Sequence, residues 1–176
     1  MIKKLSFYLL AAILLMLIVV YATGSYLTKS YNSILGLPPS NLQAKPLQIN
    51  EISGWFHQSE ISNKCVLLLH GVRSNKLSMV NRASFLNQLG YSTLLIDLQA
   101  HGETPGDEIT FGFKESDNVK TAIEFLKSKN CQKIGAIGFS LGGASILLGN
   151  KPAKLDAVIL EAVYPSIDQA VINRIE

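Results

Sequence analysis

Apolar residues follow two patterns along this chain, one long unbroken run near the N-terminus and several short runs after it. The long run, Leu5–Thr28, carries no charge and is dense in Leu, Ile, Val and Ala. Its 24 residues can cross a hydrocarbon core of about 30 Å as a helix, because each helical residue rises about 1.5 Å. Tyr8, Tyr21 and Tyr26 lie near its ends, where aromatic rings favour the membrane–water boundary. The pattern predicts that residues 1–30 form a signal anchor or transmembrane helix.

Lysines flank this run unequally, with Lys3 and Lys4 before it and only Lys29 close behind it. Because positive charge favours the cytoplasmic side, we expect a single-pass membrane protein whose C-terminal domain is extracytoplasmic. The alternative is a cleaved signal peptide with Ala22-Thr23-Gly24 as its cleavage site, which gives a secreted or periplasmic protein. Both interpretations export the domain that follows residue 30.

The short apolar runs alternate between a strand pattern and a helix pattern. Residues 31–45 contain Pro38-Pro39 together with Ser, Asn and Gly, and are expected to form a linker. Strands are predicted at 49–56 (a strand or a hairpin), 65–69, 92–96, 133–137 and 157–160, and helices at 79–89, 119–126, 141–148 and from Ser166 onward. Buried strands that alternate with helices give right-handed crossovers and a mainly parallel sheet with helices on both faces. Residues 46–176 are therefore expected to belong to one α/β domain.

The net charge of +3 is informative once it is divided along the chain. Beyond residue 30, 13 basic residues balance 13 acidic ones, which leaves no basic stripe for a nucleic acid. An apolar fraction of 48% with 16% charged residues argues against a disordered chain. Two cysteines exclude a disulfide-rich scaffold, and there is no CxxC or His/Cys cluster for zinc. We expect no nucleic-acid partner, no metal and no cofactor.

The segment Gly138-Phe139-Ser140-Leu141-Gly142 fits the pattern GxSxG. It follows a predicted buried strand and opens a predicted helix, which is the setting that a nucleophile elbow requires. So sharp a turn forces strained backbone angles on Ser140 and leaves no room for side chains at Gly138 and Gly142. The alternative is an ordinary glycine-rich turn in which Ser140 is a helix N-cap.

Two further motifs follow the preceding strands, namely His70–Val72 after the strand at 65–69 and Asp97–Gly102 after the strand at 92–96. With these motifs and Gly138–Gly143 in this order, the chain resembles the α/β-hydrolase family of serine esterases, lipases and thioesterases. The resemblance covers Ile49–Arg174. It implies an α/β-hydrolase fold that is incomplete at the C-terminus and preceded by one transmembrane helix.

The resemblance also implies roles for individual residues. In that family the elbow serine is the nucleophile, which corresponds to Ser140. The residue after the HG pair and the residue after the nucleophile supply the two oxyanion N–H groups, here Val72 and Leu141. Two donors at about 2.7–3.1 Å suit a tetrahedral acyl intermediate. His70 and His101 are implied to be structural residues of their turns.

The acid and the base of a catalytic triad are harder to place. Family triads run in the order Ser, Asp or Glu, His, and no histidine follows His101 in this sequence. Glu161, at the tip of the strand at 157–160, is a possible acid, and Asp168 is a more remote one. We expect the chain to be the N-terminal part of a longer hydrolase. By itself it would show little triad-type catalysis, because serine is a poor nucleophile without a base.

The two cysteines, Cys65 and Cys131, precede strands that are neighbours in the strand order of this family. Both would lie at the edge of the sheet away from the catalytic site, so that a disulfide is conceivable in an exported domain. The alternative is that Cys65 is simply a small buried hydrophobic residue.

These observations favour a membrane-tethered serine hydrolase that acts on small acyl esters or thioesters through Ser140. One alternative is a catalytically silent, truncated member that binds acyl ligands. Another is an exported, non-enzymatic scaffold that uses the same fold, since fold alone does not determine function.

Overall fold

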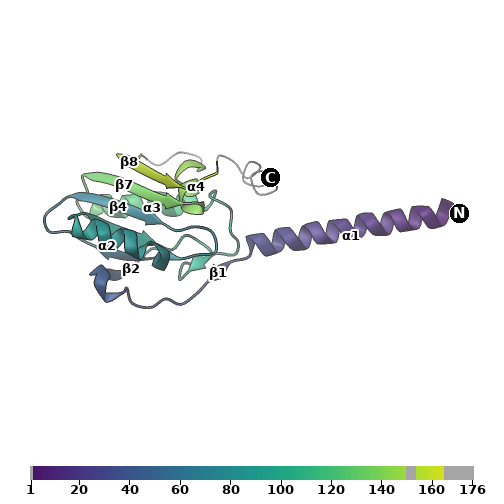
Figure 1. Cartoon of the computed structure of the whole chain (residues 1–176), viewed down its shortest axis with the longest axis horizontal. Helices are drawn as coiled ribbons and strands as arrows, with labels where there is room; N and C mark the ends of the chain where they lie inside the picture. Colours follow the sequence, from purple (N-terminus) through teal and green to yellow (C-terminus); the bar gives the residue numbers. More distant parts are fainter. Residues whose placement is uncertain (1, 150–153, 165–176) are drawn as a thin grey trace.

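The computed structural model describes residues 2–149 and 154–164, which form a layered α/β domain with one long N-terminal helix (Figure 1). In chain order the elements are α1 (Ile2–Thr28), β1 (Tyr31–Asn32), the 3-10 helix η1 (Ser40–Leu42), β2 (Lys45–Ile49), β3 (Ile52–His57), β4 (Lys64–Leu69), the 3-10 helix η2 (Lys76–Met79), α2 (Val80–Gln88), β5 (Ser92–Ile96), β6 (His101–Gly102), α3 (Glu115–Ser128), β7 (Lys133–Phe139), α4 (Leu141–Leu147) and β8 (Ala157–Glu161).

Six strands form the main sheet in the order β2-β3-β5-β4-β7-β8. β3 is antiparallel to both β2 and β5, whereas β5, β4, β7 and β8 are parallel to one another. Helices separate the parallel strands along the chain, as the alternation in the sequence predicts. The carboxyl ends of the four parallel strands therefore meet at one edge, and the loops that follow them lie together there.

The sheet is buried on both faces, and alternate residues of β4 serve different cores. Leu67 and Leu69 pack on one face with residues of α3 and α4. Val66 and Leu68 pack on the opposite face with η1, η2 and α2. This period of two explains why the strand sequence is continuously apolar: each side chain meets a helical layer on its own side.

The N-terminal part of the domain differs from the expected linker. The predicted strand or hairpin at 49–56 is a hairpin of β2 and β3, and β2 already begins at Lys45. Within residues 31–45, Tyr31 pairs with His101, and Leu42 is completely buried in the core beside α2. These few apolar side chains are scattered among Pro, Ser and Asn, so that no periodic pattern indicated their burial.

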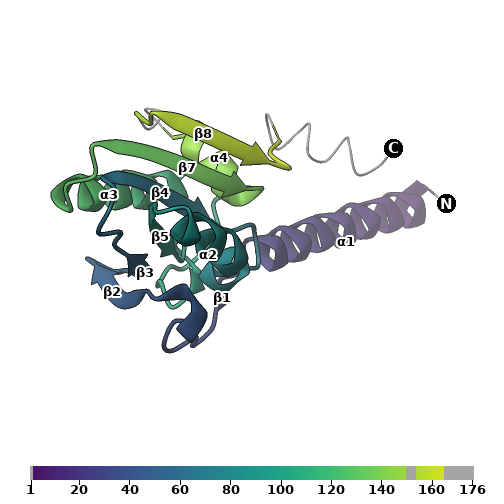
Figure 2. The same cartoon turned by 60° about the vertical axis from the view of Figure 1, so that its left-hand side comes forward.

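The N-terminal helix α1 extends away from the domain (Figures 1 and 2). Its segment Ser6–Thr28 has 23 residues and contains an 18-residue window with a mean hydropathy of 2.4, none of which is buried in the protein. Within the described residues it is the one helix long and apolar enough to cross a membrane. In both views it leaves the domain on the side toward which the arrowheads of β7 and β8 point.

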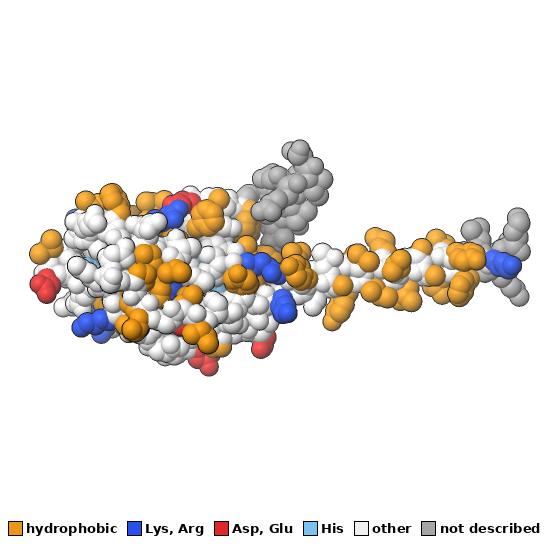
Figure 3. Space-filling view, turned by 60° about the horizontal axis from the view of Figure 1, so that its bottom comes forward, with side chains coloured by type: hydrophobic (Ala, Val, Ile, Leu, Met, Phe, Trp, Pro, Cys, Tyr) orange, Lys and Arg blue, Asp and Glu red, His pale blue; other side chains and the backbone are white. Residues whose placement is uncertain are grey.

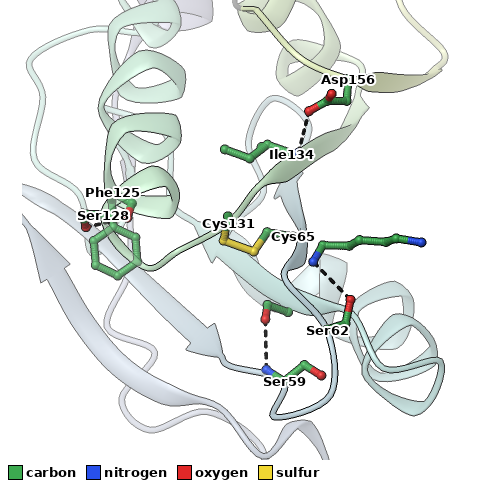
Figure 4. Close-up of a disulfide and its surroundings, with 10 residues drawn as sticks. Ser59, Ser62, Cys65, Phe125, Ser128, Cys131, Ile134 and Asp156 are labelled. Atoms are coloured by element: carbon green, nitrogen blue, oxygen red, sulfur yellow. Dashed lines mark hydrogen bonds between the residues drawn. A yellow bond between two sulfur atoms is a disulfide. The ribbon is translucent and has the colours of Figure 1, made fainter.

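A disulfide joins Cys65 at the start of β4 to Cys131 just before β7 (Figure 4). The Cα atoms of the two cysteines are 5.7 Å apart, within the range that this bond requires. The two strands are neighbours, as the strand order of the resembled family implied, with Cys65 opposite Ile134. The bond therefore closes the sheet at the edge opposite the carboxyl ends of the strands.

Strand β8 is the last strand of the sheet among the described residues. Its side chains Val158, Ile159 and Leu160 are 41%, 55% and 42% exposed. Such an apolar edge is one that natural proteins usually cover. The helix expected from Ser166 onward lies outside the described residues.

Candidate active site

Ser140 forms the turn between β7 and α4 with φ 49° and ψ −109°. A positive φ is costly for a residue that carries a Cβ atom, and it persists only where the surroundings impose it. Here the N–H of Ser140 donates to the carbonyl of Glu161 at 2.8 Å, and the Ser140 carbonyl accepts from the N–H of Ala144 at 2.9 Å. The side chain is half-buried, and its Oγ has no hydrogen-bond partner among the described residues.

Glycines allow this turn to lie against the sheet. A Cβ atom at Gly142 would lie 2.4 Å from the carbonyl oxygen of Leu69, and one at Gly138 would lie 2.5 Å from the nitrogen of Gly143. Both are backbone atoms, which move less readily than the end of a flexible side chain. The two glycines that the motif places around Ser140 are therefore sterically required, as the sequence predicts.

The loop after β4 lies next to the Ser140 turn, because β4 and β7 pair in parallel with Leu69 opposite Gly138. Val72 in this loop is 38% exposed, whereas Leu141, the first residue of α4, is buried. Within residues 2–149 and 154–164, the N–H groups of Val72 and Leu141 have no hydrogen-bond acceptor. At Leu141 this is expected, since the first N–H groups of a helix lack an intrahelical partner.

His70 is completely buried, and both of its ring nitrogens bind backbone groups. Nε2 accepts from the N–H of Leu98 at 3.0 Å, and Nδ1 lies 2.7 Å from the carbonyl of Gly71. Only the neutral ring with its proton on Nδ1 satisfies both bonds. Burial lowers the pKa of His70 to about 4, despite the opposing effect of the bond to Gly71.

His101 has the same arrangement. Its Nε2 accepts from the N–H of Arg73 at 3.2 Å, and its Nδ1 lies 2.9 Å from the carbonyl of Gln99. Burial is also the main cause that lowers the pKa of His101. The third histidine, His57, ends β3 and contacts the carbonyl of Gln43 at 3.0 Å. None of the three rings has a hydrogen bond to Ser140.

Glu161, at the end of β8, is held by Arg82 from α2. The Nε atom of Arg82 donates to Oε1 of Glu161 at 3.1 Å, and Nη2 donates to Oε2. This hydrogen bonding raises the pKa of Arg82. The carboxylate of Glu161 thus faces a guanidinium, while its backbone carbonyl accepts from Ser140. Arg82 has no motif around it, so the sequence did not indicate this pair; Asp168 lies outside the described residues.

A second cluster of charged side chains is formed by the loops that follow β4 and β5. The ammonium of Lys76, which is completely buried, lies 2.6 Å from Oδ2 of Asp97 and 2.7 Å from Oε2 of Glu103. Ser53 accepts from the same ammonium at 3.0 Å, and the ring of Trp55 lies 5.0 Å from it. Burial opposes ionisation of Glu103, but bonds from Lys76 and two backbone N–H groups lower its pKa to about 2. The sequence indicated Asp97 only as part of a motif, since its partner comes from another loop.

Other features do not form a comparable site. A hollow of about 600 Å³ is lined by Ser59, Ser62 and Cys65, at the disulfide edge and away from Ser140. In the part of the chain that the structure describes, no group of three or more His, Cys, Asp or Glu side chains is placed to hold a metal ion.

Comparisons with known sequences place this arrangement among hydrolases. Residues 66–175 match the sequence profile of the Alpha/beta hydrolase family. A carboxylesterase of Bacillus subtilis is 36% identical over 89 residues, which are 49% of this chain and 36% of that protein. YqkD, an uncharacterized protein of Bacillus subtilis, is 28% identical over 100 residues, which are 56% of this chain and 33% of that protein. The chain thus spans about a third of the length of these relatives.

Solved structures of hydrolases also resemble this chain. The esterase Pf2001 of Pyrococcus furiosus superposes with a TM-score of 0.60 at 30% identity, over 67% of this chain and 51% of that chain. A putative alpha/beta hydrolase of Agrobacterium tumefaciens superposes with a TM-score of 0.55 at 14% identity, which reflects the fold alone. That second match covers 69% of this chain and 61% of the other.

Proposed function

Because this chain belongs to the alpha/beta hydrolase family, we propose that it is a serine hydrolase of acyl esters or thioesters with Ser140 as its nucleophile. The observation that carries the proposal is the backbone of Ser140, at φ 49° between β7 and α4, together with an Oγ that no described residue binds. Strain of this kind is retained where a side chain must project from a tight turn. The similarity to a carboxylesterase and to the esterase Pf2001 supports the same substrate class.

In this proposal the Oγ of Ser140 attacks the acyl carbon, and the carbonyl electrons move to the oxygen. The N–H groups of Val72 and Leu141 then stabilise the oxyanion, which is consistent with their lack of an acceptor among the described residues. Collapse of the intermediate breaks the bond to the alcohol or thiol, which leaves with a proton. Water then attacks the acyl-serine, releases the carboxylic acid and restores the Oγ–H group.

The proton of Ser140 requires a base. Both ring nitrogens of His70 and His101 bind backbone groups, and Nδ1 of His57 contacts the carbonyl of Gln43 at the end of β3, so that none of these rings contacts Ser140. We therefore place the general base outside the described residues. We assign Glu161 a positioning role rather than that of the triad acid. Its carboxylate is held by Arg82, and its backbone carbonyl accepts from the N–H of Ser140.

The localisation that we propose is a membrane anchor formed by α1, with the domain on the extracytoplasmic side. Two features support this side: the lysines that precede the apolar span, and the disulfide between Cys65 and Cys131. Disulfides persist in oxidising compartments and are rare in the cytosol. The signal-peptide alternative gives the same compartment without the anchor.

A fluorophosphonate probe tests the nucleophile, since it reacts covalently with activated serines. We expect labelling of the membrane-bound protein that is lost in Ser140→Ala and retained in Ser145→Ala. Ser145 is a matched control because it lies on the same helix and its hydroxyl donates to the carbonyl of Gly142. A folded protein with an intact disulfide that takes up no probe would contradict the proposal. The engagement of all three histidines would then favour the silent, acyl-binding alternative.

A further inference from the structure

The end of α1 contacts the loop that carries Val72. The guanidinium carbon of Arg73 lies 4.6 Å from the centre of the Tyr26 ring, and its Nη2 donates to the Tyr26 carbonyl. The backbone N–H of Arg73 is at the same time bound by His101. One residue thus joins the last turn of the apolar helix to the loop next to Ser140.

Several backbone hydrogen bonds fix the segment that follows α1 to the domain. The carbonyl of Thr28 accepts from the N–H of Ile109 at 2.7 Å, and the N–H of Tyr31 donates to the carbonyl of Ala100 at 2.7 Å. Further along, Oε1 of Glu103 accepts from the N–H groups of Leu35 and Gly36 at 2.9 Å each. So many bonds within a few residues exclude a flexible tether and fix the direction in which α1 leaves the domain.

All of these contacts are made with one edge of the sheet. Arg73 belongs to the loop after β4, and residues 97–109 form the loop after β5. Both strands are parallel to β7, which ends at Ser140. The helix therefore leaves from the edge that carries the candidate active site, as both cartoon views show (Figures 1 and 2).

The length of the apolar span leaves no spacer between the membrane and this edge. A hydrocarbon core of about 30 Å needs about 20 helical residues. Counted from Phe7, 20 residues end at Tyr26, which is the residue that Arg73 contacts. When α1 spans a bilayer, Arg73 and its neighbours lie at the level of the lipid headgroups.

The side chains around the junction are of the kinds that occur at a membrane surface. Figure 3 shows cationic and hydrophobic side chains next to each other where α1 meets the domain. On the loops of this edge, Val72 is 38% and Phe113 is 58% exposed, and Lys29 at the end of the helix is also exposed. Exposed apolar and aromatic side chains beside long cationic ones suit a membrane–water interface.

We propose that α1 holds the Ser140 edge against the membrane surface, so that the site receives acyl lipids laterally from the bilayer in which the protein is anchored. The substrate part of this inference rests on the proposed hydrolase function. The reaction is hydrolysis of a lipid ester with water to a fatty acid and an alcohol. The position of the edge, in contrast, depends only on α1 and its contacts.

The position of the edge can be tested with a fluorophore attached at one site at a time. The protein is placed in lipid vesicles whose headgroups carry a spin label that quenches nearby fluorophores. Asp107→Cys places the fluorophore at the edge near the end of α1, and Lys127→Cys places it at the opposite end of α3. This helix alone has 14 residues and separates the two edges by about 20 Å. We expect loss of fluorescence at position 107 and unchanged fluorescence at position 127. Equal quenching at both positions, or none at 107, would overturn the proposal.

A flexible insertion after α1 tests two questions separately: whether the edge lies at the membrane surface, and whether the substrate comes from the bilayer. About twelve Gly and Ser residues between Thr28 and Lys29 allow the domain to move about 20 Å from the bilayer. The same residues placed before Ile2 are the control. We expect the first insertion to abolish quenching at position 107 and to reduce hydrolysis of a vesicle-embedded lipid ester roughly tenfold, through a lower effective concentration. Hydrolysis of a water-soluble short-chain ester should stay unchanged.

Undiminished hydrolysis of the embedded ester after the insertion would overturn lateral delivery from the bilayer, and hydrolysis of the soluble ester alone by the parent protein would overturn the lipid substrate. No hydrolysis of either ester by a parent protein that carries its general base would overturn the proposed function and the substrate with it. The quenching measurement decides the position of the edge in each case.

Discussion

The Nζ atom of Lys76 lies 2.6 Å from Oδ2 of Asp97, and both side chains are completely buried. Asp97 begins the loop after β5, and Lys76 opens η2 in the loop region after β4. Because Lys76 also binds Glu103, which holds the segment after α1, one ammonium connects two loops of the candidate site to that segment. The candidate site and the direction of α1 therefore depend on the same ion pair.

Replacing this lysine should destabilise the domain severely. Lys76→Ala leaves the carboxylate of Asp97 buried without a cation, and breaking a buried pair in this way typically costs about 3–5 kcal/mol. Guanidinium unfolding in detergent, followed by the fluorescence of Trp55, measures the loss. The control is Lys114→Ala, which removes an exposed pair with Glu108 and should cost less than about 1 kcal/mol. Similar losses in the two variants would contradict a special role for the buried pair.

The disulfide should contribute strongly to stability because it closes a long loop. The sequence separation of Cys65 and Cys131 is 66, for which the loop-closure relation gives about 4 kcal/mol. We expect Cys65→Ser/Cys131→Ser to lower the free energy of unfolding by this order. A reductant should destabilise the parent protein equally and leave the double variant unchanged. A parent protein that is insensitive to reductant, or two free thiols in its mass spectrum, would refute the prediction.

Stability should fall as the pH is lowered from about 6.5 to about 4. The folded protein keeps His70 neutral with a pKa of about 4, whereas the unfolded chain takes up a proton near pH 6.5. The unfolded state thus binds more protons in this window, and the loss approaches about 3 kcal/mol. The free energy of unfolding against pH measures it. His70→Asn should flatten the curve in part, because burial also lowers the pKa of His101, which remains. Glu103, with a pKa of about 2, acts only at lower pH.

The glycines of the Ser140 turn should not tolerate a methyl group. A Cβ atom at Gly142 meets a backbone oxygen at 2.4 Å, so that Gly142→Ala should cost about 1–3 kcal/mol or more. Gly135→Ala is the control within β7, where the nearest atom lies 3.4 Å from the new Cβ atom. Thermal unfolding of both variants makes the comparison. Gly142→Ala should also lose labelling by the fluorophosphonate probe, and equal stability of the two variants would show that the turn can relax.

The periodicity of the sequence determined much of the fold. The continuous apolar run of β4 predicted a strand buried on both faces, and the structure assigns Val66 and Leu67 to opposite cores. The uncharged run at the N-terminus predicted α1. Gly138 and Gly142 predicted the tight turn around Ser140. At Gly138 the steric requirement is local, since a Cβ atom would meet Gly143, whereas at Gly142 it comes from Leu69 of the neighbouring strand.

Other relationships required the tertiary structure. Lys76 and Arg82 belong to no motif, and the motif that precedes Arg73 does not indicate its partner. The partners Asp97, Glu161 and Tyr26 are 21, 79 and 47 residues away along the chain. The burial of Leu42 within the expected linker was equally undetectable.

The sequence by itself determined which segments form helices and strands and which serine stands in a strained turn, since these depend on local sterics and on the period of apolar residues. Only the tertiary structure decided which charges are paired, which nitrogens of the histidines are engaged, and that α1 leaves from the edge of Ser140. Pairing of this kind depends on chain topology, which brings together side chains that no local pattern relates.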